Sequence, residues 1–317
     1  MSSILTGLIE EAGSIAIAGH VRPDGDCVGA VTGLYNYIKD NWPDKETDIY
    51  LEDFADVYLY APGAEKARHT IRKDKIYDLF VILDVSDRER IGVAGEYLGT
   101  AKKTICIDHH ISNSGVAQTD YIRSDMSSAS EVLFTLFEED KISRETATAL
   151  YIGIICDTGC FKHSNTTRRT METAGVLMEK GARSDVLIDA VFYSKTFMQN
   201  KLLGKCLDEA VLELGGKCIV CLVTRAMLNE FNADSKDLEG VIDQLRVTKG
   251  TEVAVLMTQI KAGEYKLSMR SNGKVDVNKV CAAYGGGGHI LAAGATAHGH
   301  GADIKESFLE AIGAQLN

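Results

Sequence analysis

The stretch Thr104-Ile105-Cys106-Ile107-Asp108-His109-His110 joins an apolar run to one carboxylate and two imidazoles. Short apolar runs of this kind are typical of buried strands. Three further apolar runs also end on side chains that can hold a metal ion. They are residues 15–19 before His20, Asp24 and Asp26, residues 79–83 before Asp84, and residues 152–156 before Asp157. We therefore expect the function of the chain to lie at these four run ends.

Strand and helix patterns alternate through the first half of the chain. Strands are expected at residues 14–18, 48–51, 78–84 and 104–108, and helices at 3–12, 27–39, 90–98, 129–139, 143–156 and 167–180. This alternation favours βαβ units and a mostly parallel sheet. The near-continuous apolar strands fit a sheet that is covered on both faces. The predicted fold class is α/β, with a doubly wound, mostly parallel N-terminal sheet.

The second half of the chain has the pattern of a smaller α+β domain. Strands are expected at 218–223, 252–260 and 264–270, and helices at 277–283 and 303–316. Residues 197–214 look like one amphipathic helix, which we take as the connection between the domains. The predicted division is 1–188 for the catalytic domain, 189–213 for a helical linker and 214–317 for the second domain.

Composition limits the class of protein. The 317 residues suggest two domains, and 45% hydrophobic with 25% charged residues is ordinary for a globular chain. No apolar run approaches the ~20 residues that span a bilayer, and the N-terminus lacks a basic segment typical of signal peptides. The eight cysteines are scattered, mostly in apolar runs, which favours reduced thiols. We expect a cytoplasmic protein with no membrane partner.

Charge and cysteine spacing exclude two kinds of site. The net charge of −11 argues against a broad basic face for duplex DNA. A small anionic substrate stays possible, because local arginines and metal ions can reverse the field in a cleft. The single Cys-x-x-Cys, Cys218 to Cys221, lies in an expected strand. Positions three apart on a strand face opposite sides, so this pair should be core packing rather than a zinc site.

The acidic and histidine side chains at the run ends form the candidate metal site. The carboxyl ends of parallel strands meet at one edge of a sheet, so these side chains should converge there. Asp157 is harder to place, since its run also fits a helix. A single aspartate after a strand is more often a helix N-cap, and a single histidine more often a core residue. Four such coincidences together favour a metal site.

The donor types indicate which ions would bind. No cysteine belongs to the set, which disfavours a structural zinc site. Carboxylates with some histidine suit Mn²⁺, and all-oxygen sites suit Mg²⁺. The donors outnumber the needs of one ion. Two ions about 3.5–4 Å apart, bridged by a carboxylate, are used for phosphoester hydrolysis, where they activate a bridging water.

Five segments resemble known motifs. His20-Val21-Arg22-Pro23-Asp24-Gly25-Asp26, Leu83-Asp84-Val85-Ser86, Asp108-His109-His110 and Asp157-Thr158-Gly159 resemble the four motifs of the DHH phosphoesterase superfamily. Gly285-Gly286-Gly287-Gly288-His289, followed by Ala292-Ala293-Gly294, resembles the signature of the DHHA1 domain. The chain looks like the compact nanoRNase/pAp phosphatase group. This resemblance implies hydrolysis of very short oligoribonucleotides to 5′-mononucleotides, and of 3′,5′-adenosine bisphosphate to AMP.

The resemblance also implies roles for individual residues. One Mn²⁺ ion would be held by His20, Asp24 and Asp84, and a second by Asp26, Asp84, His109 and Asp157. Mg²⁺ or Co²⁺ could substitute. His110 would stabilise the phosphoryl group or donate a proton, and Asp108 would orient the neighbouring imidazole.

The glycine run suggests a substrate contact in the second domain. Four consecutive glycines allow a ligand to approach the backbone closely, and successive N–H groups can form an anion nest. His289 adds a donor, and Arg270 offers a fork suited to phosphate. Taken alone, the run fits a flexible turn equally well. With the resemblance, we expect Arg270, Gly286, Gly287, Gly288 and His289 to bind substrate.

Several alternatives stay open. Some relatives of this group cleave cyclic or linear dinucleotides. Manganese-dependent inorganic pyrophosphatases share the first-domain motifs but lack the glycine run. Long single-strand exonucleases of the superfamily carry a further nucleic-acid-binding domain, for which this length leaves no room. A non-catalytic nucleotide-sensing module should have lost a metal ligand, and all six expected ligands are present. A homodimer is a family-level expectation.

Overall fold

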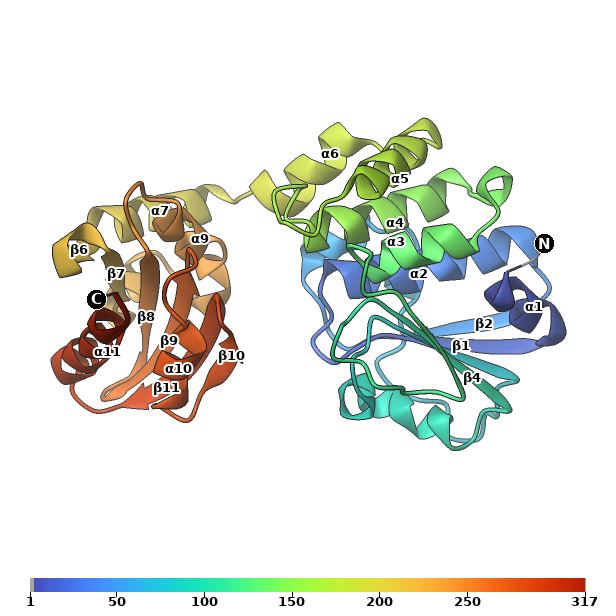
Figure 1. Ribbon diagram of the computed structural model, residues 1–317, viewed down its shortest axis with the longest axis horizontal. Helices are drawn as coiled ribbons and strands as arrows, with labels where there is room; N and C mark the ends of the chain where they lie inside the picture. The colour runs from blue at the N-terminus through green and yellow to red at the C-terminus, as the bar shows by residue number, and fades with distance from the viewer. Residues whose placement is uncertain (1–2, 317) are drawn as a thin grey trace. The chain divides into compact units, whose positions relative to one another are not determined.

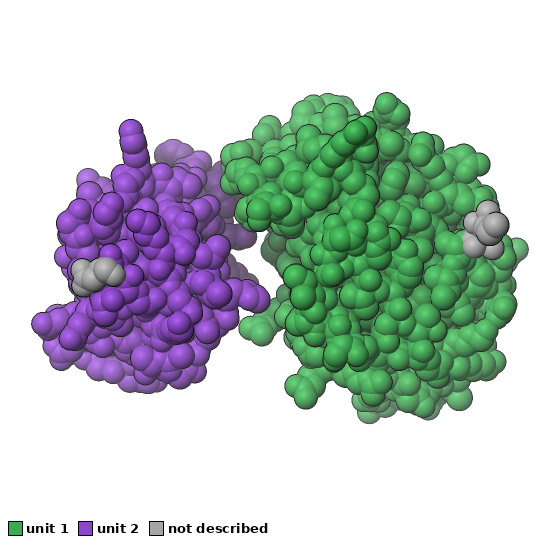
Figure 2. Space-filling model, viewed as in Figure 1, with its two compact units in different colours: residues 1–194 green, residues 195–317 purple. Residues whose placement is uncertain are grey.

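The computed structural model describes residues 3–316. The chain divides between Ser194 and Lys195 into two compact units, called below units 1–194 and 195–317 (Figure 2). Helix α7 (Phe197–Asp208) therefore belongs to the second unit and is not a separate linker. This helix was expected to reach residue 214. It ends earlier because Val211–Glu213 forms strand β6, which pairs with β7. Among residues 3–316, no helix has the length and apolar character to cross a membrane.

A five-stranded parallel sheet organises the first unit (Figure 1). The strand order is β2-β1-β3-β4-β5, and every neighbouring pair is parallel. The strands are β1 (Ser14–Ala18), β2 (Glu46–Tyr50), β3 (Leu79–Leu83), β4 (Lys103–Asp108) and β5 (Thr119–Ile122). The predicted parallel sheet is therefore confirmed. The edge strand β5 escaped prediction because it is short and only half-buried, so it lacks a long apolar run.

Both faces of this sheet are covered, as predicted. The side chains of Ile15 and Ile17 pack into a core beneath the helices, while Ala16 and Ala18 pack on the opposite face. The helices are α1 (Ile4–Glu11), α2 (Gly25–Asn41), α3 (Ala129–Leu136), α4 (Arg144–Asp157), α5 (Arg168–Glu179) and α6 (Ser184–Ile188). Figure 1 shows α2, α3 and α4 on one side of the strands. A helix was expected at residues 90–98, and the structure instead has 3-10 turns at Arg88–Leu98 over the other face.

Close packing of α2 against α4 brings the two helices together near the strand ends. A Cβ at Gly29 would lie 2.6 Å from the backbone oxygen of Ala149, and one at Gly153 would lie 2.5 Å from Asp26 Oδ1. These distances are too short for a side chain, so glycine is required at both positions. The two glycines allow the end of α4 to approach the start of α2.

The second unit is built on a six-stranded mixed sheet in the order β10-β11-β9-β8-β7-β6. Its further strands are β7 (Cys218–Val223), β8 (Val253–Lys261), β9 (Glu264–Ser271), β10 (Gly287–His289) and β11 (Ala292–His298). Its further helices are α8 (Arg225–Glu230), α9 (Val241–Arg246), α10 (Val277–Ala282) and α11 (Gly301–Leu316). The predicted α+β class is confirmed. Cys218 and Cys221 belong to cores on opposite faces of β7, as expected.

Candidate metal centre

The carboxyl ends of three adjacent strands carry the donors of the candidate centre. His20 follows β1, Asp84 follows β3, and Asp108 ends β4 just before His109 and His110. Two helices complete the set: Asp24 caps the start of α2 and Asp26 lies in its first turn, while Asp157 is the last residue of α4. The run before Asp157 is therefore helical, and the helix delivers its carboxylate to the same end of the sheet.

Asp84 lies between two imidazoles. Its Oδ2 is 3.4 Å from His20 Nε2, and its Oδ1 is 3.4 Å from His109 Nε2. The side chain is only 3% exposed, and its Oδ1 accepts no hydrogen bond. The backbone of Asp84 has φ of +58°, a conformation that aspartate tolerates better than most residues. A buried carboxylate oxygen without a partner is costly, so this position calls for a cation.

The ring of His20 presents a nitrogen to two carboxylates. Its Nδ1 lies 2.9 Å from the Val21 backbone oxygen, which can only accept, so Nδ1 carries a hydrogen. Its Nε2 lies 3.6 Å from Asp24 Oδ1 and 3.4 Å from Asp84 Oδ2. Burial lowers the pKa of His20, but the hydrogen bonds to Asp24 and Asp84 outweigh it and raise the pKa to about 10. Nε2 thus attracts a positive charge, which a metal ion can supply in place of a proton.

A second cluster of donors surrounds His109. Its Nε2 lies 3.1 Å from Asp157 Oδ2, and contacts with Asp157 and Asp84 outweigh burial and raise its pKa to about 11. Burial, Asp84 and Asp157 together raise the pKa of Asp26 well above its ordinary value. Burial, with the charge of Asp84, also raises the pKa of Asp157. Such carboxylates repel one another, and a divalent cation would relieve the repulsion.

The start of helix α3 holds Asp26 in place. Asp26 is fully buried, and its two oxygens accept hydrogen bonds from the backbone N–H groups of Ala129, at 2.6 Å, and Ser130, at 3.1 Å. These are donors at a helix N-terminus, where negative charge is favoured. The residues lie more than a hundred positions apart in sequence. Sequence reasoning gave no signal for this contact, although it did predict the helix.

His110 is oriented by a buried carboxylate. Its Nδ1 donates to Asp108 Oδ1 at 2.7 Å, and Asp108 has no exposed surface. The other carboxylate oxygen accepts from Asn113 Nδ2 at 2.8 Å, and the same amide donates to the Val85 backbone oxygen at 2.9 Å. Burial would raise the pKa of Asp108, but the bonds from His110 and Asn113 lower it. Asn113 was missed; its position three residues after His110 was the available signal.

Among residues 3–316, three overlapping groups of side chains could each hold a metal ion. Within each group the donor atoms lie within 4.8 Å of one another. The groups are Asp84 with Asp108, His109 and His110; His20 with Cys27 and Asp84; and Asp26 with His109 and Asp157. Because Asp84 belongs to two groups and His109 to two, the candidate centre is continuous. The carboxylate and imidazole donors fit a divalent ion.

The expected substrate residues of the second unit lie in the β10–β11 hairpin and, for Arg270, in the neighbouring strand β9. Strand β10 pairs with β11, and His289 and Arg270 lie on either side of Ala292 in one row across the sheet. Arg270 Nη1 donates to the Met269 backbone oxygen, and its Nε is 4.0 Å from Asp243 Oδ1. The structure therefore brings Arg270 and His289 near one another on the same sheet face.

The predicted anion nest is contradicted. The N–H groups of Gly285 and Gly286 donate to backbone oxygens of α10, and that of Gly288 donates to Asn278 Oδ1 at 2.9 Å. They are therefore already satisfied within the unit. A Cβ at Gly286 would lie 2.3 Å from the Gly294 oxygen, and one at Gly288 would lie 2.5 Å from the Ala292 oxygen. Glycine is needed at these two positions by the neighbouring strand.

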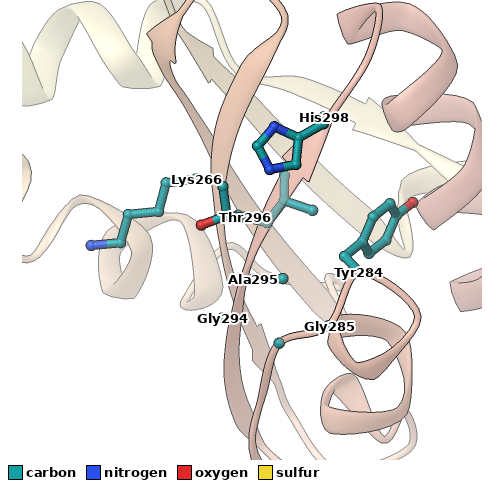
Figure 3. A pocket seen from close by; sticks show the side chains of 9 residues that line it. Lys266, Tyr284, Gly285, Gly294, Ala295, Thr296 and His298 are labelled. Carbon is teal, nitrogen blue, oxygen red and sulfur yellow. The ribbon is translucent and has the colours of Figure 1, made fainter.

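A shallow pocket of about 550 Å³ adjoins the glycine run (Figure 3). Its polar lining residues are Lys266 from β9, Tyr284 before the run, and Thr296 and His298 from β11. Gly285, Gly286 and Gly294 form part of its floor. Small residues on the hairpin leave the space open.

Comparison with known families agrees with this arrangement. Residues 14–154 match the profile of the DHH family, N-terminal domain, and residues 215–317 match that of the DHHA1 domain. The chain belongs to the DHH/DHHA1 family. The candidate centre lies in the DHH domain, apart from Asp157, which follows the matched residues. The hairpin with the glycine run lies in the DHHA1 domain.

Named relatives place this DHH/DHHA1 protein in the nanoRNase-like group. It is 29% identical over 309 residues to the bifunctional oligoribonuclease and PAP phosphatase NrnA of Thermus thermophilus, covering 96% of this chain and 90% of the relative. It is 25% identical over 296 residues to NrnA of Bacillus subtilis, with 89% of each chain covered. An exopolyphosphatase-related protein from Bacteroides fragilis shares the fold, with a TM-score of 0.88, 24% identity, and 98% and 96% coverage.

Proposed function

We propose that the protein is a Mn²⁺-dependent phosphoesterase acting on short oligoribonucleotides, on 3′,5′-adenosine bisphosphate, or on both. The observation that carries the proposal is the position of Asp84, whose two oxygens each face a different imidazole. A buried carboxylate in this position suits a bridge between two ions. The names of the relatives, which are oligoribonucleases and PAP phosphatases, support the substrate class.

The proposal assigns the donors to two ions. His20, Asp24 and Asp84 would hold one, and Asp26, Asp84, His109 and Asp157 the other. The orphaned Asp84 oxygen and the raised pKa of Asp26 are the features that these ions would satisfy. When bound, two such ions supply activation of water and neutralisation of charge on a phosphoryl group. Mn²⁺ is preferred because the site mixes carboxylates with imidazoles, and Mg²⁺ or Co²⁺ could substitute.

The other residues of the DHH domain would position the phosphoryl group and its proton. His110 uses Nδ1 to donate to Asp108, which leaves Nε2 to face the substrate. The raised pKa of His110, caused first by its hydrogen bond to Asp108, favours the charged ring. A charged imidazole can stabilise phosphoryl oxygens and give a proton to the leaving group. Asp108 itself would be a positioning residue.

The DHHA1 domain would bind the rest of the substrate. Arg270 and His289 share one row of the sheet face and offer donors for a terminal phosphate. Because the nest is contradicted, Gly286 and Gly288 would serve by shaping the hairpin rather than by binding with their N–H groups. At Gly287 a Cβ would meet only an ordinary contact, with Asn278 Oδ1 at 3.5 Å, so this glycine is the one of the three that would leave room for a ligand.

Hydrolysis of cyclic or linear dinucleotides is the second candidate. The chain is 27% identical over 316 residues to the cyclic-di-AMP phosphodiesterase GdpP of Geobacillus thermodenitrificans, covering 93% of this chain but 46% of that protein. The DHHA1 domain argues against an inorganic pyrophosphatase. The complete set of donors argues against a sensing module that does not hydrolyse.

A Mn²⁺-dependent hydrolysis panel tests the proposal. The substrates are 3′,5′-adenosine bisphosphate, linear diadenylate, a labelled five-nucleotide RNA, cyclic di-AMP and pyrophosphate. Turnover of 3′,5′-adenosine bisphosphate or of the five-nucleotide RNA supports the proposal, and the relative rates identify the main substrate. Turnover of linear diadenylate or cyclic di-AMP alone favours the second candidate, and turnover of pyrophosphate alone contradicts the substrate class.

The role of Asp84 is tested by replacing it. Asp84→Ala should abolish turnover and remove Mn²⁺ binding measured by calorimetry, because both ions lose a shared ligand. Asp87→Ala, which changes a carboxylate three residues away in the same loop, serves as the control and should retain Mn²⁺ binding. Full Mn²⁺-dependent turnover in Asp84→Ala would rule out the bridging role.

A further inference from the structure

The segment that follows Asp157 has an uncommon backbone conformation. Gly159, Cys160 and Phe161 have φ values of +53°, +58° and +63°, so three successive residues lie in the left-handed region. This region is strained for residues other than glycine, and most of all for bulky ones. Such strain persists only where the surrounding structure imposes it, and it gathers at functional sites. The packing around segment 158–166 therefore imposes a specific shape on it.

A side chain at the end of α4 helps to impose this conformation. The Thr158 hydroxyl donates to the Ile154 backbone oxygen at 2.6 Å and accepts from the Phe161 N–H at 3.0 Å. One side chain therefore joins the last turn of the helix to the strained turn behind it. Because of this contact, segment 158–166 folds back onto the helix that carries Asp157.

The amide of Asn165 lies near the end of this segment and bridges two elements of the candidate metal centre. Its Nδ2 donates to the Asp157 backbone oxygen at 3.2 Å and to the Ser127 backbone oxygen at 3.1 Å. Both partners are carbonyl oxygens, which can only accept, so the NH₂ side of the amide must face them. Ser127 lies just before α3, whose first N–H groups hold Asp26. One amide thus connects the helix that carries Asp157 to the helix that holds Asp26.

The carboxylates of Asp26 and Asp157 need such a restraint because they have like charge. One donor atom each of Asp26, His109 and Asp157 all lie within 4.8 Å of one another. Before an ion binds, carboxylates this close repel, and they would separate if their helices were free to move. A connection between the two helices keeps the pair close together, so less rearrangement is needed when a divalent ion binds.

We propose that Asn165 is a positioning residue for the ion that Asp26 and Asp157 share, and that it acts by fixing the distance between their carboxylates. This inference rests on the two-ion site proposed above. The other proposed ion has no ligand on α3 or α4, since its ligands are His20, Asp24 and Asp84. Loss of the Asn165 amide should therefore weaken one ion of the pair and leave the other largely unchanged.

Two substitutions in the full chain test this role. Asn165→Ala removes the donor, and Asn165→Asp keeps the shape but sets an oxygen against two carbonyl oxygens. Calorimetry with Mn²⁺ alone, without substrate, measures the two affinities. Both variants should weaken one Mn²⁺ by about 10–100-fold, the usual effect of losing a group that orients a ligand, and the other by less than about threefold.

Electron paramagnetic resonance gives a second readout that general destabilisation does not produce. The parent with both ions bound should show the broadened spectrum of two interacting Mn²⁺ ions. At the same Mn²⁺ concentration, the Asn165 variants should show the resolved lines of an isolated ion. Asp157→Ala, which removes a ligand of the same ion, should give a similar spectrum. Adding Asn165→Ala to Asp157→Ala should cause little further loss of affinity, because the two changes act through one ligand.

Asn41 provides the matched control. Its Nδ2 also donates to two backbone oxygens, those of Tyr37 at 2.8 Å and Lys141 at 3.2 Å. Asn41→Ala should therefore keep both Mn²⁺ affinities and the spectrum of interacting ions. Urea unfolding checks that each variant folds. Asn165→Gln, which retains an amide donor, replaces Asn165→Ala if the alanine variant does not fold.

The outcomes separate this inference from the proposed function. Asn165 variants that bind both Mn²⁺ ions as tightly as the parent overturn the role of Asn165 and leave the two-ion site standing. Equal weakening of both ions also overturns it, as does failure of every Asn165 variant to fold, because either result shows a general structural role. A parent protein that binds fewer than two Mn²⁺ ions contradicts the two-ion site itself.

Discussion

At the scale of single residues, the hydrogen bonds of Asp108 explain how one imidazole is oriented. A fully buried carboxylate needs partners for both oxygens. His110 serves one and Asn113 serves the other. Asn113 also ties the residue to the loop after β3 through the Val85 backbone oxygen. The direction of the His110 ring therefore depends on an amide that holds Asp108 and not the ring itself.

Asn113→Ala should lower kcat by about 10–100-fold, the usual effect of losing a residue that orients a site. KM should change little, because the terminal phosphate is bound elsewhere in the proposal. Steady-state kinetics with linear diadenylate measure both constants. Asn113→Gln, which keeps the amide, should recover part of the activity. A rise in KM with kcat unchanged would contradict the positioning role.

At the scale of elements, one carboxylate ties β1 to the start of β3. Asp78 Oδ2 accepts hydrogen bonds from the backbone N–H groups of Gly13 and Ser14, each at 2.9 Å. Its Oδ1 is 2.7 Å from Lys102 Nζ. Lys102 and these donors lower the pKa of Asp78 to about 2, against a small opposing effect of burial. The residue thus helps to set the positions of the strands that carry His20 and Asp84.

Asp78→Asn should lower the free energy of unfolding at pH 7 by about 1–2 kcal/mol. The folded pKa lies below the unfolded value of about 3.9, so the carboxylate stabilises the fold above about pH 4, and this contribution is lost as the pH falls towards 2. The difference between variant and parent should shrink below about pH 4. Urea unfolding from pH 7 to pH 3 measures it, with the exposed Asp74→Asn as control. If the difference in free energy of unfolding between Asp78→Asn and the parent does not change with pH, the Asp78 carboxylate does not have the proposed stabilising role.

The glycines of the β10–β11 hairpin have separable roles. Alanine at Gly286 or Gly288 would collide with the backbone of β11, whereas the nearest atom to a Cβ at Gly287 is Asn278 Oδ1 at 3.5 Å. Gly286→Ala and Gly288→Ala should each destabilise the protein by about 1–3 kcal/mol. Gly287→Ala should stay within about 0.5 kcal/mol of the parent. Thermal unfolding compares the three, and equal losses at all three positions would be inconsistent with this geometry.

At the scale of the whole molecule, the first unit would bind the metal ions and the second would bind the substrate. Every proposed metal ligand lies within residues 1–194, and every proposed substrate residue of the glycine hairpin lies within 195–317. Changes in the first unit should then act on metal binding and kcat. Changes in the second should act mainly on KM, since they remove contacts made equally in the bound substrate and the transition state.

Arg270→Ala and His289→Ala should each raise KM for 3′,5′-adenosine bisphosphate by about tenfold, the usual effect of losing a hydrogen bond to a charged group. Their kcat values should stay within about twofold of the parent. His300→Ala, an exposed histidine near the end of the same sheet, is the control. An unchanged KM in both variants would remove the hairpin from the substrate site.

Much of this protein was predictable from its sequence because the relevant signals are local. Apolar runs of strand length predicted β1, β3 and β4, and the residue after each run predicted where donors would gather. Parallel strands then required those ends to meet. Short, half-buried β5 and the glycine-containing β10 lacked such runs, so their pairing was not foreseen.

The amino-acid sequence by itself determined the donor types, the parallel sheet and the two-domain class. Only the tertiary structure decided which groups satisfy one another. The N-terminus of α3 holds Asp26, Asn113 holds Asp108, β11 takes the space beside Gly286 and Gly288, and Gly19 admits the sulfur of Cys27. Periodicity reports whether a residue is buried, but its partners depend on how distant segments pack, and packing is a property of the folded whole.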